Sequence, residues 1–384
     1  MKIDKKYREM ILDRVDLETV VSSYVGEMKR KGHRSWACCP FHKENTPSFC
    51  VDTAKNLWYC YGSCHEGGTV IDFVMKAENL PYHLAVKKLL KEQLQIDLTD
   101  SDMQQTPEEE QRQKKRETMF ALKAQLAQWF HEQLYADTPE AKAALDYVRS
   151  RWDESYCREL LVGYAPTDGR AAVRWAEQRG WRTELLLETN EFKESEKTHD
   201  LYCVIRNRVV IPVRDRFHRV EGYTSRTMGD DDRKYINSAE SEIYHKSRSL
   251  FGIDMAIRDA RRQEKLYCVE GGPDVMKLQS VGLLNTIAPL GGRWTDDQLQ
   301  MLKDWRMGSY TLCFIPDSDP PKGGEKLGAG DRNVMEAGRQ AMMKGFPVSV
   351  KSLPNDTGKK MDADSYCQCA EDITMLPEKE FLLW

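Results

Sequence analysis

From Lys265 onward, short apolar segments alternate with longer amphipathic ones, and two of the apolar segments end in carboxylates. Residues 266–269 are followed by Glu270, and residues 310–315 are followed by Asp317-Ser318-Asp319. Strands that alternate with helices predict a mostly parallel sheet with helices on its faces. Because the carboxyl ends of parallel strands meet at one edge of a sheet, we expect these carboxylates to gather there.

Further acidic residues extend this pattern. Asp274 follows Glu270 in a Gly-rich turn, and Asp362 and Asp364 form a third acidic pair near the end of the chain. Magnesium prefers oxygen ligands, keeps several waters and usually binds through carboxylates together with substrate phosphates. A single Asp-x-Asp is more often a polar turn. Several carboxylates at successive strand ends instead indicate a divalent-cation site and phosphoryl chemistry.

A second cluster of potential metal ligands lies near the N-terminus. Cys38-Cys39-Pro40-Phe41-His42 is followed by a C-x3-C pair, Cys60 and Cys64. Two ligand pairs separated by a short hairpin are typical of a zinc ribbon, which holds one structural zinc ion. We predict Cys39, His42, Cys60 and Cys64 as the ligands, with Cys38 and His65 as alternatives. Such an ion stabilises a domain that is too small to fold without it.

Basic and aromatic residues surround these ligands. They are Lys29, Arg30, Lys31, His33, Arg34, Lys43 and Lys55, interleaved with Trp36, Phe41, Trp58 and Tyr59. Such a surface can contact the phosphates and stack the bases of a single nucleic-acid strand. The alternative interpretation is that the aromatic residues form the core of the small ribbon.

Composition limits the class of protein. The chain has 384 residues, 40% of them hydrophobic, with a formal net charge of -4. This length predicts two or three globular domains, and the charge disfavours a uniformly cationic protein. No apolar stretch approaches the ~18 residues of a membrane span, and the N-terminus lacks a signal-peptide core. We therefore expect a cytoplasmic protein without a membrane partner, and the eleven cysteines do not indicate a disulfide framework.

Three sets of motifs, taken together, resemble the bacterial DnaG-type primases. The first covers residues 39–49. The second covers residues 206–213, 234–238 and 246–252, and the third covers residues 269–271, 317–319 and 360–364. The resemblance runs across nearly the whole chain. It implies a DNA-dependent RNA polymerase that makes short RNA primers de novo on single-stranded DNA from ribonucleoside triphosphates.

The resemblance also implies a domain order within a multidomain α+β and α/β fold. A zinc ribbon (residues 1–98) and a linker (99–118) precede the N-terminal subdomain of the RNA polymerase core (119–262). A Toprim subdomain (263–370), with a mostly parallel sheet flanked by helices, and a C-terminal tail (371–384) follow. Within the N-terminal subdomain of the polymerase core, sequence periodicity predicts helices in the first part. It predicts strands near residues 204–213 and 220–223.

Site residues follow from the same resemblance. Glu270, Asp317 and Asp319 are expected to be catalytic. The expected ligands of catalytic Mg²⁺ or Mn²⁺ are Glu270, Asp274, Asp317, Asp319, Asp362 and Asp364. The expected nucleotide- and template-binding cations are Arg151, Arg226, Lys234 and Lys246.

The chain departs from the family pattern at several positions. Trp152 stands where a glycine normally follows the first of these cations, which leaves Arg149 as an alternative to Arg151. The family's Gly-Gly before the residue that corresponds to Arg226 is Thr224-Ser225 here. Its Gly-Thr loop is Gly291-Gly292-Arg293, which adds a cation that could touch a phosphate.

The sequence also bears on possible partners and on alternative functions. A replicative helicase is a further partner that the resemblance implies. The C-terminal domain by which these primases usually bind the helicase has no counterpart after Asp364. We therefore expect either a truncated primase or a naturally short one. One alternative function is a Toprim nicking or topoisomerase-like enzyme, although none of the sixteen tyrosines lies in a recognisable cleavage motif. The other is a non-catalytic DNA-binding protein of a mobile element, which the complete acidic set disfavours.

Overall fold

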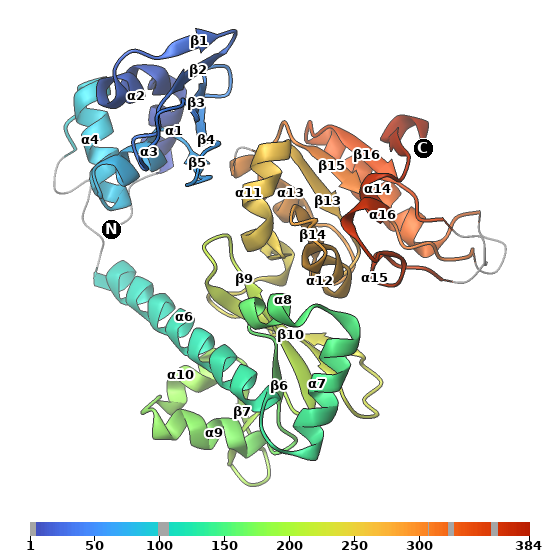
Figure 1. Cartoon of the computed structure of the whole chain (residues 1–384). Helices are drawn as coiled ribbons and strands as arrows, with labels where there is room; N and C mark the ends of the chain where they lie inside the picture. The colour runs from blue at the N-terminus through green and yellow to red at the C-terminus, as the bar shows by residue number, and fades with distance from the viewer. Residues whose placement is uncertain (1–4, 99–106, 306, 322–325, 355–359) are drawn as a thin grey trace. The chain divides into compact units, whose positions relative to one another are not determined.

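The computed structural model describes residues 5–98, 107–305, 307–321, 326–354 and 360–384. The chain forms two compact units, residues 1–114 and 115–384 (Figure 1). Among the described residues, no helix is both long and apolar enough to cross a membrane.

The first unit consists of a five-stranded antiparallel sheet and the helices packed against it. The strands, in sheet order, are β1 (Lys29–Lys31), β2 (Arg34–Ala37), β3 (Phe49–Asp52), β4 (Leu57–Cys60) and β5 (Gly67–Gly68). The helices are α1 (Lys5–Arg14), α2 (Leu17–Val25), α3 (Val70–Ala77) and α4 (Tyr82–Leu94). Asn56, in the β3–β4 turn, accepts a hydrogen bond from the Leu17 amide and donates one to the Val15 carbonyl. This contact ties the ribbon hairpin to the start of α2.

The aromatic residues of this unit have two different environments. Phe49 and Trp58 are buried and stack with their ring centroids 5.2 Å apart, and Phe41 and Phe73 pack against them. These rings are core. Other rings lie nearer the surface: Tyr61 contacts Trp36 at 5.6 Å and Tyr59 at 4.8 Å and is 38% exposed. The core interpretation is therefore confirmed for Phe41 and Trp58, whereas base stacking by the rings nearer the surface stays a prediction.

The second unit begins at Lys115, within α6 (Pro107–Leu134). Residues 99–106 of the expected linker lie outside the described residues, and from Pro107 its remainder is helical. The helices that follow are α7 (Pro139–Arg151), α8 (Glu154–Leu160), α9 (Gly169–Gln178) and α10 (Thr183–Glu188). They pack on an antiparallel sheet of β11 (Tyr235–Asn237), β10 (Val220–Thr227), β9 (Arg208–Arg214) and β6 (Gly163–Ala165), in that order. A small hairpin is formed by β7 (Phe192–Glu194) and β8 (Leu201–Cys203).

A six-stranded sheet forms the remainder of this unit. Its order is β12 (Leu250–Phe251), β14 (Thr286–Pro289), β13 (Lys265–Cys268), β15 (Thr311–Phe314), β16 (Val348–Lys351) and β17 (Glu378–Glu380). The four inner strands are parallel, whereas the two edge strands are antiparallel. The predicted fold class, a zinc-ribbon domain followed by a mixed core with a mostly parallel sheet, is confirmed. The finer domain boundaries stay a prediction.

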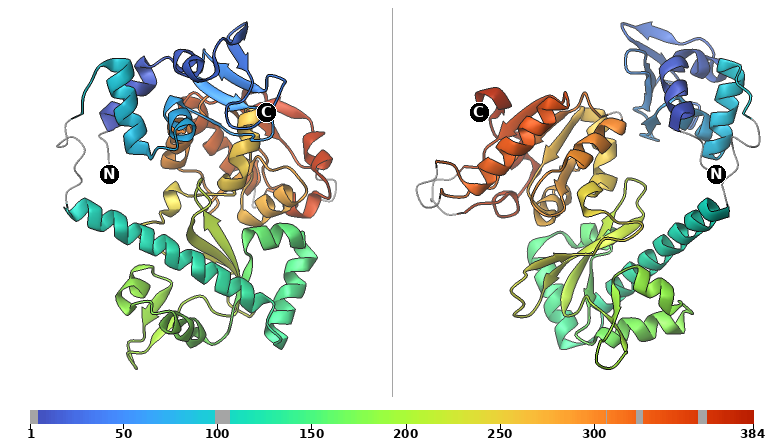
Figure 2. Two further views of the ribbon diagram at one scale, coloured as in Figure 1. Left: turned by 60° about the vertical axis from the view of Figure 1, so that its left-hand side comes forward. Right: turned by 180° about the vertical axis from the view of Figure 1, so that it is seen from behind.

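Helices cover both faces of this sheet, as the two views in Figure 2 show. Leu266 and Cys268 of β13 face a core that includes residues of α11 (Ile253–Gln263), α13 (Asp296–Asp304) and α14 (Ala329–Met343). Tyr267 and Val269 face a core with residues of α12 (Gly272–Ser280), α15 (Ala363–Tyr366) and α16 (Ala370–Thr374). Alternate residues of a strand point to opposite faces, so the apolar run of β13 serves both cores.

The second of these cores continues into α7, α8 and β9. The Tyr156 hydroxyl of α8 donates a hydrogen bond to Gln279 of α12 at 2.7 Å, and both side chains are buried. The helical part of the second unit and the parallel sheet are therefore packed together, which brings residues of α7 to the edge where the carboxylates lie.

Residues 371–384, expected as a tail, contain most of α16, β17 and the 3-10 helix η2 (Phe381–Leu383). Glu378 of β17 accepts hydrogen bonds from Lys265 of β13 at 2.8 Å and from Ser349 of β16 at 2.6 Å. These partners are distant in sequence, so local residue pattern gave no sign of the edge strand.

Candidate metal centres

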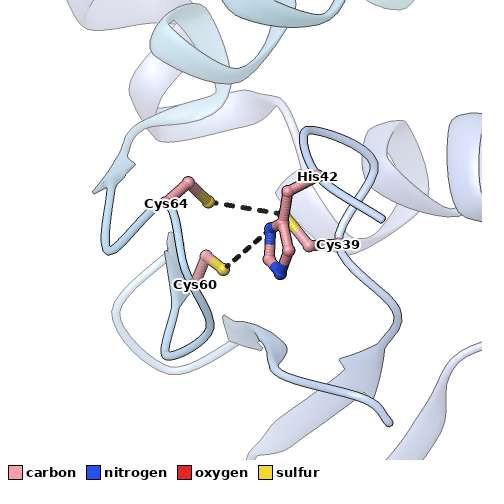
Figure 3. Close-up of side chains that lie close together, drawn as sticks. All are labelled: Cys39, His42, Cys60 and Cys64. Atoms are coloured by element: carbon pink, nitrogen blue, oxygen red, sulfur yellow. Dashed lines mark hydrogen bonds between the residues drawn. The ribbon is translucent and has the colours of Figure 1, made fainter. Parts of the chain in front are cut away.

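Four side chains of the first unit converge between two loops (Figure 3). Cys39 and His42 follow β2, Cys60 ends β4, and Cys64 precedes β5. The sulfur atoms of Cys39 and Cys64 are 3.6 Å apart, and Cys60 Sγ lies 3.8 Å from His42 Nδ1. All four candidate ligand atoms lie within 4.8 Å of one another. Zinc–sulfur bonds of ~2.3 Å in a tetrahedron place ligand atoms at such separations, so the residues fit one zinc ion.

The predicted ligand set, rather than either alternative, forms this group. Cys38 is exposed, and His65 lies outside the group. Burial opposes ionisation of Cys60, but hydrogen bonds from Ser48, Cys64 and Cys39 outweigh it and lower the pKa of the thiol. The thiolate is the form that binds zinc. The zinc ribbon therefore supplies a structural Zn²⁺ site.

Glu44 stabilises this centre through hydrogen bonds, a role that was not predicted from the sequence. One carboxylate oxygen accepts hydrogen bonds from the amides of Cys39 at 2.6 Å and Ser48 at 3.2 Å. The other lies 3.0 Å from His42 Nε2 and accepts from the Ser48 hydroxyl. A carboxylate that orients a histidine ring fixes which ring nitrogen faces the metal. The only signal in the sequence was an acidic residue two positions after His42.

Carboxylates of the second unit meet at the carboxyl edge of the parallel sheet. Glu270 follows β13, and Asp317 and Asp319 follow its neighbour β15. The backbone of Ser318 pairs with that of Met361 through hydrogen bonds of 2.7 and 3.1 Å. This bridge brings the segment with Asp362 alongside Asp317 and Asp319. Three distant stretches thus reach one edge.

Glu270 has an unpaired oxygen in this cluster. Its Oε1 is buried and has no hydrogen-bond partner in the described structure. Burial and the neighbouring Asp317 carboxylate raise the pKa of Glu270 to about 7. Gly330, in the first turn of α14, lies against both groups: a Cβ atom there would come within 2.3 Å of the Asp317 carbonyl and 2.7 Å of Glu270 Oε1. Only glycine allows the helix to approach this closely.

Lys360 supplies positive charge to the same cluster, although it was not among the predicted site residues. Its ammonium lies 2.8 Å from Asp317 Oδ2 and 3.3 Å from Asp319 Oδ1. Burial raises the pKa of Asp317, against the opposing effect of Lys360. The signal in the sequence was the position of Lys360 just before the acidic pair, but its partners are more than forty residues away.

Asp274 and Asp364 connect the cluster to the surrounding structure. Asp274 is buried, and its carboxylate accepts hydrogen bonds from the Gly271 amide at 3.2 Å and the Asp364 amide at 3.1 Å. Burial, followed by the charges of Asp317, Asp362 and Glu270, raises the pKa of Asp274 well above its usual range. Asp364 forms an ion pair with Arg151 at the end of α7. Arg149, whose side chain is exposed, pairs instead with half-buried Glu154.

The carboxylates are less tightly grouped than the zinc ligands. Within the described ranges, no three of them bring oxygen atoms within 4.8 Å of one another. Hard divalent cations commonly bind through one or two carboxylates, with waters and phosphates completing the shell. The unpaired oxygen of Glu270 and the oxygen-only donor set fit Mg²⁺ or Mn²⁺ in that manner.

Of the remaining predicted cations, Arg226 lies on β10, Lys234 immediately precedes β11, and Lys246 begins η1 (Lys246–Arg248). Arg226 of β10 stacks on Tyr147 of α7 at 4.2 Å, and Arg151 lies 6.0 Å from the same ring. Lys234 and Lys246 are exposed. Tyr147 thus links Arg226 to Arg151, and through Arg151 to Asp364 of the carboxylate cluster.

Comparison with known proteins agrees with this arrangement. The CHC2 zinc finger matches residues 3–106, and the N-terminal domain of the DNA primase catalytic core matches residues 129–257. The DNA primase of Staphylococcus aureus is 28% identical over 372 residues, which are 95% of this chain and 57% of that protein. The chain thus spans little more than half the length of this relative.

Solved structures show the same fold. The Aquifex aeolicus primase, comprising zinc-binding and RNA polymerase domains, aligns with a TM-score of 0.60 and 27% identity over 99% of this chain and 87% of that one. A DnaG primase catalytic domain bound to ssDNA aligns with a TM-score of 0.53 and 26% identity over 65% of this chain and 76% of that one.

A zinc-ribbon unit followed by a mixed core with a mostly parallel sheet is the arrangement found in solved structures of the primase class. The CHC2 zinc finger and the N-terminal domain of the DNA primase catalytic core follow one another along the chain. In this order of domains the chain is similar to the DnaG-type primases.

Proposed function

We propose that this chain is a DNA primase that joins ribonucleotides de novo on a single-stranded DNA template. The observation that carries the proposal is the convergence of Glu270, Asp317 and Asp319 at two adjacent strand ends, beside Lys360. A relative of the same fold was solved with ssDNA bound, which supports the template class. The similarity in sequence to the DNA primase of Staphylococcus aureus supports the reaction class.

In the proposed site, Mg²⁺ or Mn²⁺ is held by Glu270, Asp317 and Asp319, with Asp274, Asp362 and Asp364 contributing to the same centre. When bound, such ions activate the attacking hydroxyl and neutralise phosphate charge. The 3′-hydroxyl oxygen forms a bond to the α-phosphorus of the incoming nucleotide and releases its proton to solvent water. The bond from that phosphorus to the β-phosphate oxygen breaks, and pyrophosphate leaves.

Cationic side chains have a separate part in this proposal. Arg226, Lys234 and Lys246 contact the phosphates of template and nucleotide, while Arg151 holds Asp364 in place. Lys360 offsets the mutual repulsion of Asp317 and Asp319. The zinc ribbon holds the template, with the exposed ring of Tyr61 and the half-buried rings of Trp36 and Tyr59 as candidates for stacking. A replicative helicase as recruiting partner stays a prediction from the family resemblance.

The test is primer synthesis on single-stranded DNA with ribonucleotides and Mn²⁺. RNA oligomers from the wild type that are lost in Asp317→Ala and retained in Asp304→Ala would support the proposal. Asp304 is a suitable control because it is an exposed carboxylate on α13. DNA cleavage, or DNA binding without any RNA product, would contradict it.

A further inference from the structure

Arg293 lies on a tight turn between β14 and α13. Gly291 and Gly292, immediately before it, have φ angles of 114° and 77°, a region that favours glycine. The Thr295 hydroxyl donates a hydrogen bond to the Ser247 carbonyl, and Gln298 Nε2 donates one to the Ser249 carbonyl at 2.8 Å. The turn is therefore fixed against η1.

A second cation lies against the same turn. A Cβ atom built on Gly291 would come within 2.4 Å of Lys246 Cε and 2.6 Å of Lys246 Nζ. The Lys246 ammonium thus occupies the space beside Gly291, two residues before Arg293. Two positive side chains consequently flank one rigid turn, at the carboxyl edge of the sheet where the acidic cluster lies.

Arg293 also lines a pocket that Glu270 enters from β13. The pocket is partly open to solvent and is formed at the carboxyl ends of β13, β14 and β15 and by α14. Trp294, Phe314 and Asn333 contribute to its walls. Arg293 is exposed and makes no ion pair or hydrogen bond with any other residue of the described ranges.

An exposed arginine most often has no role other than keeping the protein soluble. This one differs because it is unpaired, is held by a Gly-Gly turn and borders the pocket that contains Glu270. A cluster of carboxylates repels a nucleoside triphosphate, so a nearby guanidinium lowers the electrostatic cost of binding. Guanidinium groups bind phosphate oxygens in a bidentate manner that a lone ammonium does not provide.

We propose that Arg293, together with Lys246, binds the β- and γ-phosphates of the incoming ribonucleoside triphosphate. The inference rests on the proposed function and adds to it a nucleotide-positioning residue. Because the β- and γ-phosphates depart as pyrophosphate, the same two cations bind the leaving product.

The test measures ATP binding by equilibrium dialysis in Mn²⁺, without template, for the full chain. Arg293→Gln is compared with Arg293→Lys and with Arg258→Gln, an exposed arginine on α11 that does not line the pocket. We expect about tenfold weaker ATP binding for Arg293→Gln, an intermediate value for Arg293→Lys and less than about twofold change for Arg258→Gln. Inhibition of primer synthesis by inorganic pyrophosphate should weaken in the same order.

The possible outcomes separate this inference from the proposed function. ATP binding by Arg293→Gln that equals the wild type overturns the inference, even if the wild type makes primers. ATP binding that depends on Arg293 in a chain that makes no RNA supports the nucleotide site and contradicts the primase reaction. No ATP binding by the wild type overturns both.

Discussion

The guanidinium of Arg151, at the end of α7, forms an ion pair with Asp364 of α15, 213 positions later in the chain. The Asp364 side chain is 5% exposed, whereas that of Arg151 is 33% exposed. Removing the arginine would leave a buried carboxylate without its partner, beside several other carboxylates. The pair therefore connects the helical part of the second unit to the acidic edge of the parallel sheet.

Arg151→Ala is expected to destabilise the second unit by roughly 1–3 kcal/mol, because an unpaired buried charge is costly and partial exposure reduces that cost. Primer synthesis should fall as well. Arg149→Ala is the matched control, since its pair with Glu154 is exposed and such pairs contribute little. Thermal unfolding of both variants checks the prediction. Equal loss of stability in the two would contradict it.

Cys39→Ser is expected to abolish zinc binding and to unfold the first unit, because zinc-ribbon domains depend on the metal for stability. Cys38→Ser should retain one zinc ion per chain, since Cys38 is exposed and lies outside the ligand group. Metal analysis of the purified variants, together with limited proteolysis of residues 1–114, decides the matter. Zinc retained in Cys39→Ser, or lost in Cys38→Ser, would show that the ligand set is wrong.

Gly330→Ala should strongly reduce primer synthesis without affecting zinc content. The added methyl group would collide with the Asp317 backbone and with Glu270 Oε1, so α14 must move away from the strand ends. Gly308→Ala is the control, because its Cβ would meet only Lys303 side-chain atoms at an ordinary 3.6 Å. Activity of both variants should be measured at equal folded fraction. A fully active Gly330→Ala would argue against close packing of α14 on the site.

The pH dependence of stability should include a contribution from Glu221 of β10. Burial raises its pKa from an ordinary 4.5 to about 7, against the opposing hydrogen bond from Ser249. The folded state therefore binds the proton more tightly, so stability is lost as pH rises from about 4.5 to about 7. In Glu221→Gln, the decrease in unfolding free energy over this pH range should be smaller by roughly 1–3 kcal/mol. Urea unfolding across that range is the measurement.

The control for this experiment is Glu159→Gln, which replaces an exposed carboxylate of α8. It should leave the slope of unfolding free energy against pH unchanged. A slope for Glu221→Gln as steep as that of the wild type would refute the assignment.

Local pattern was sufficient for much of the fold. The apolar run of residues 266–269 predicted β13 because a strand buried on both faces needs no polar alternation. The two Cys-containing pairs predicted the zinc ribbon because the ligand spacing fits a single tetrahedral ion. In each case, the information lies within a short stretch of sequence.

Long-range contacts were harder to predict. The resemblance assigned Arg151 a role, but its partner Asp364 is determined by the packing of α7 and α8 on α12. The contacts of Lys360 with Asp317 depend on the bridge between Ser318 and Met361. The edge strand β17 consists of exposed, charged residues, so no apolar periodicity marks it. Such features arise from tertiary packing rather than from local propensity.

The most direct test of the account is a double-mutant comparison of primer synthesis in Mn²⁺, using Glu270→Gln, Asp317→Asn and the combined variant. If both carboxylates bind the same ions, each single change should reduce the rate by about 10³-fold, and the combined change should reduce it little further. Losses that multiply, or primer synthesis that survives either single change, would contradict a shared catalytic metal centre.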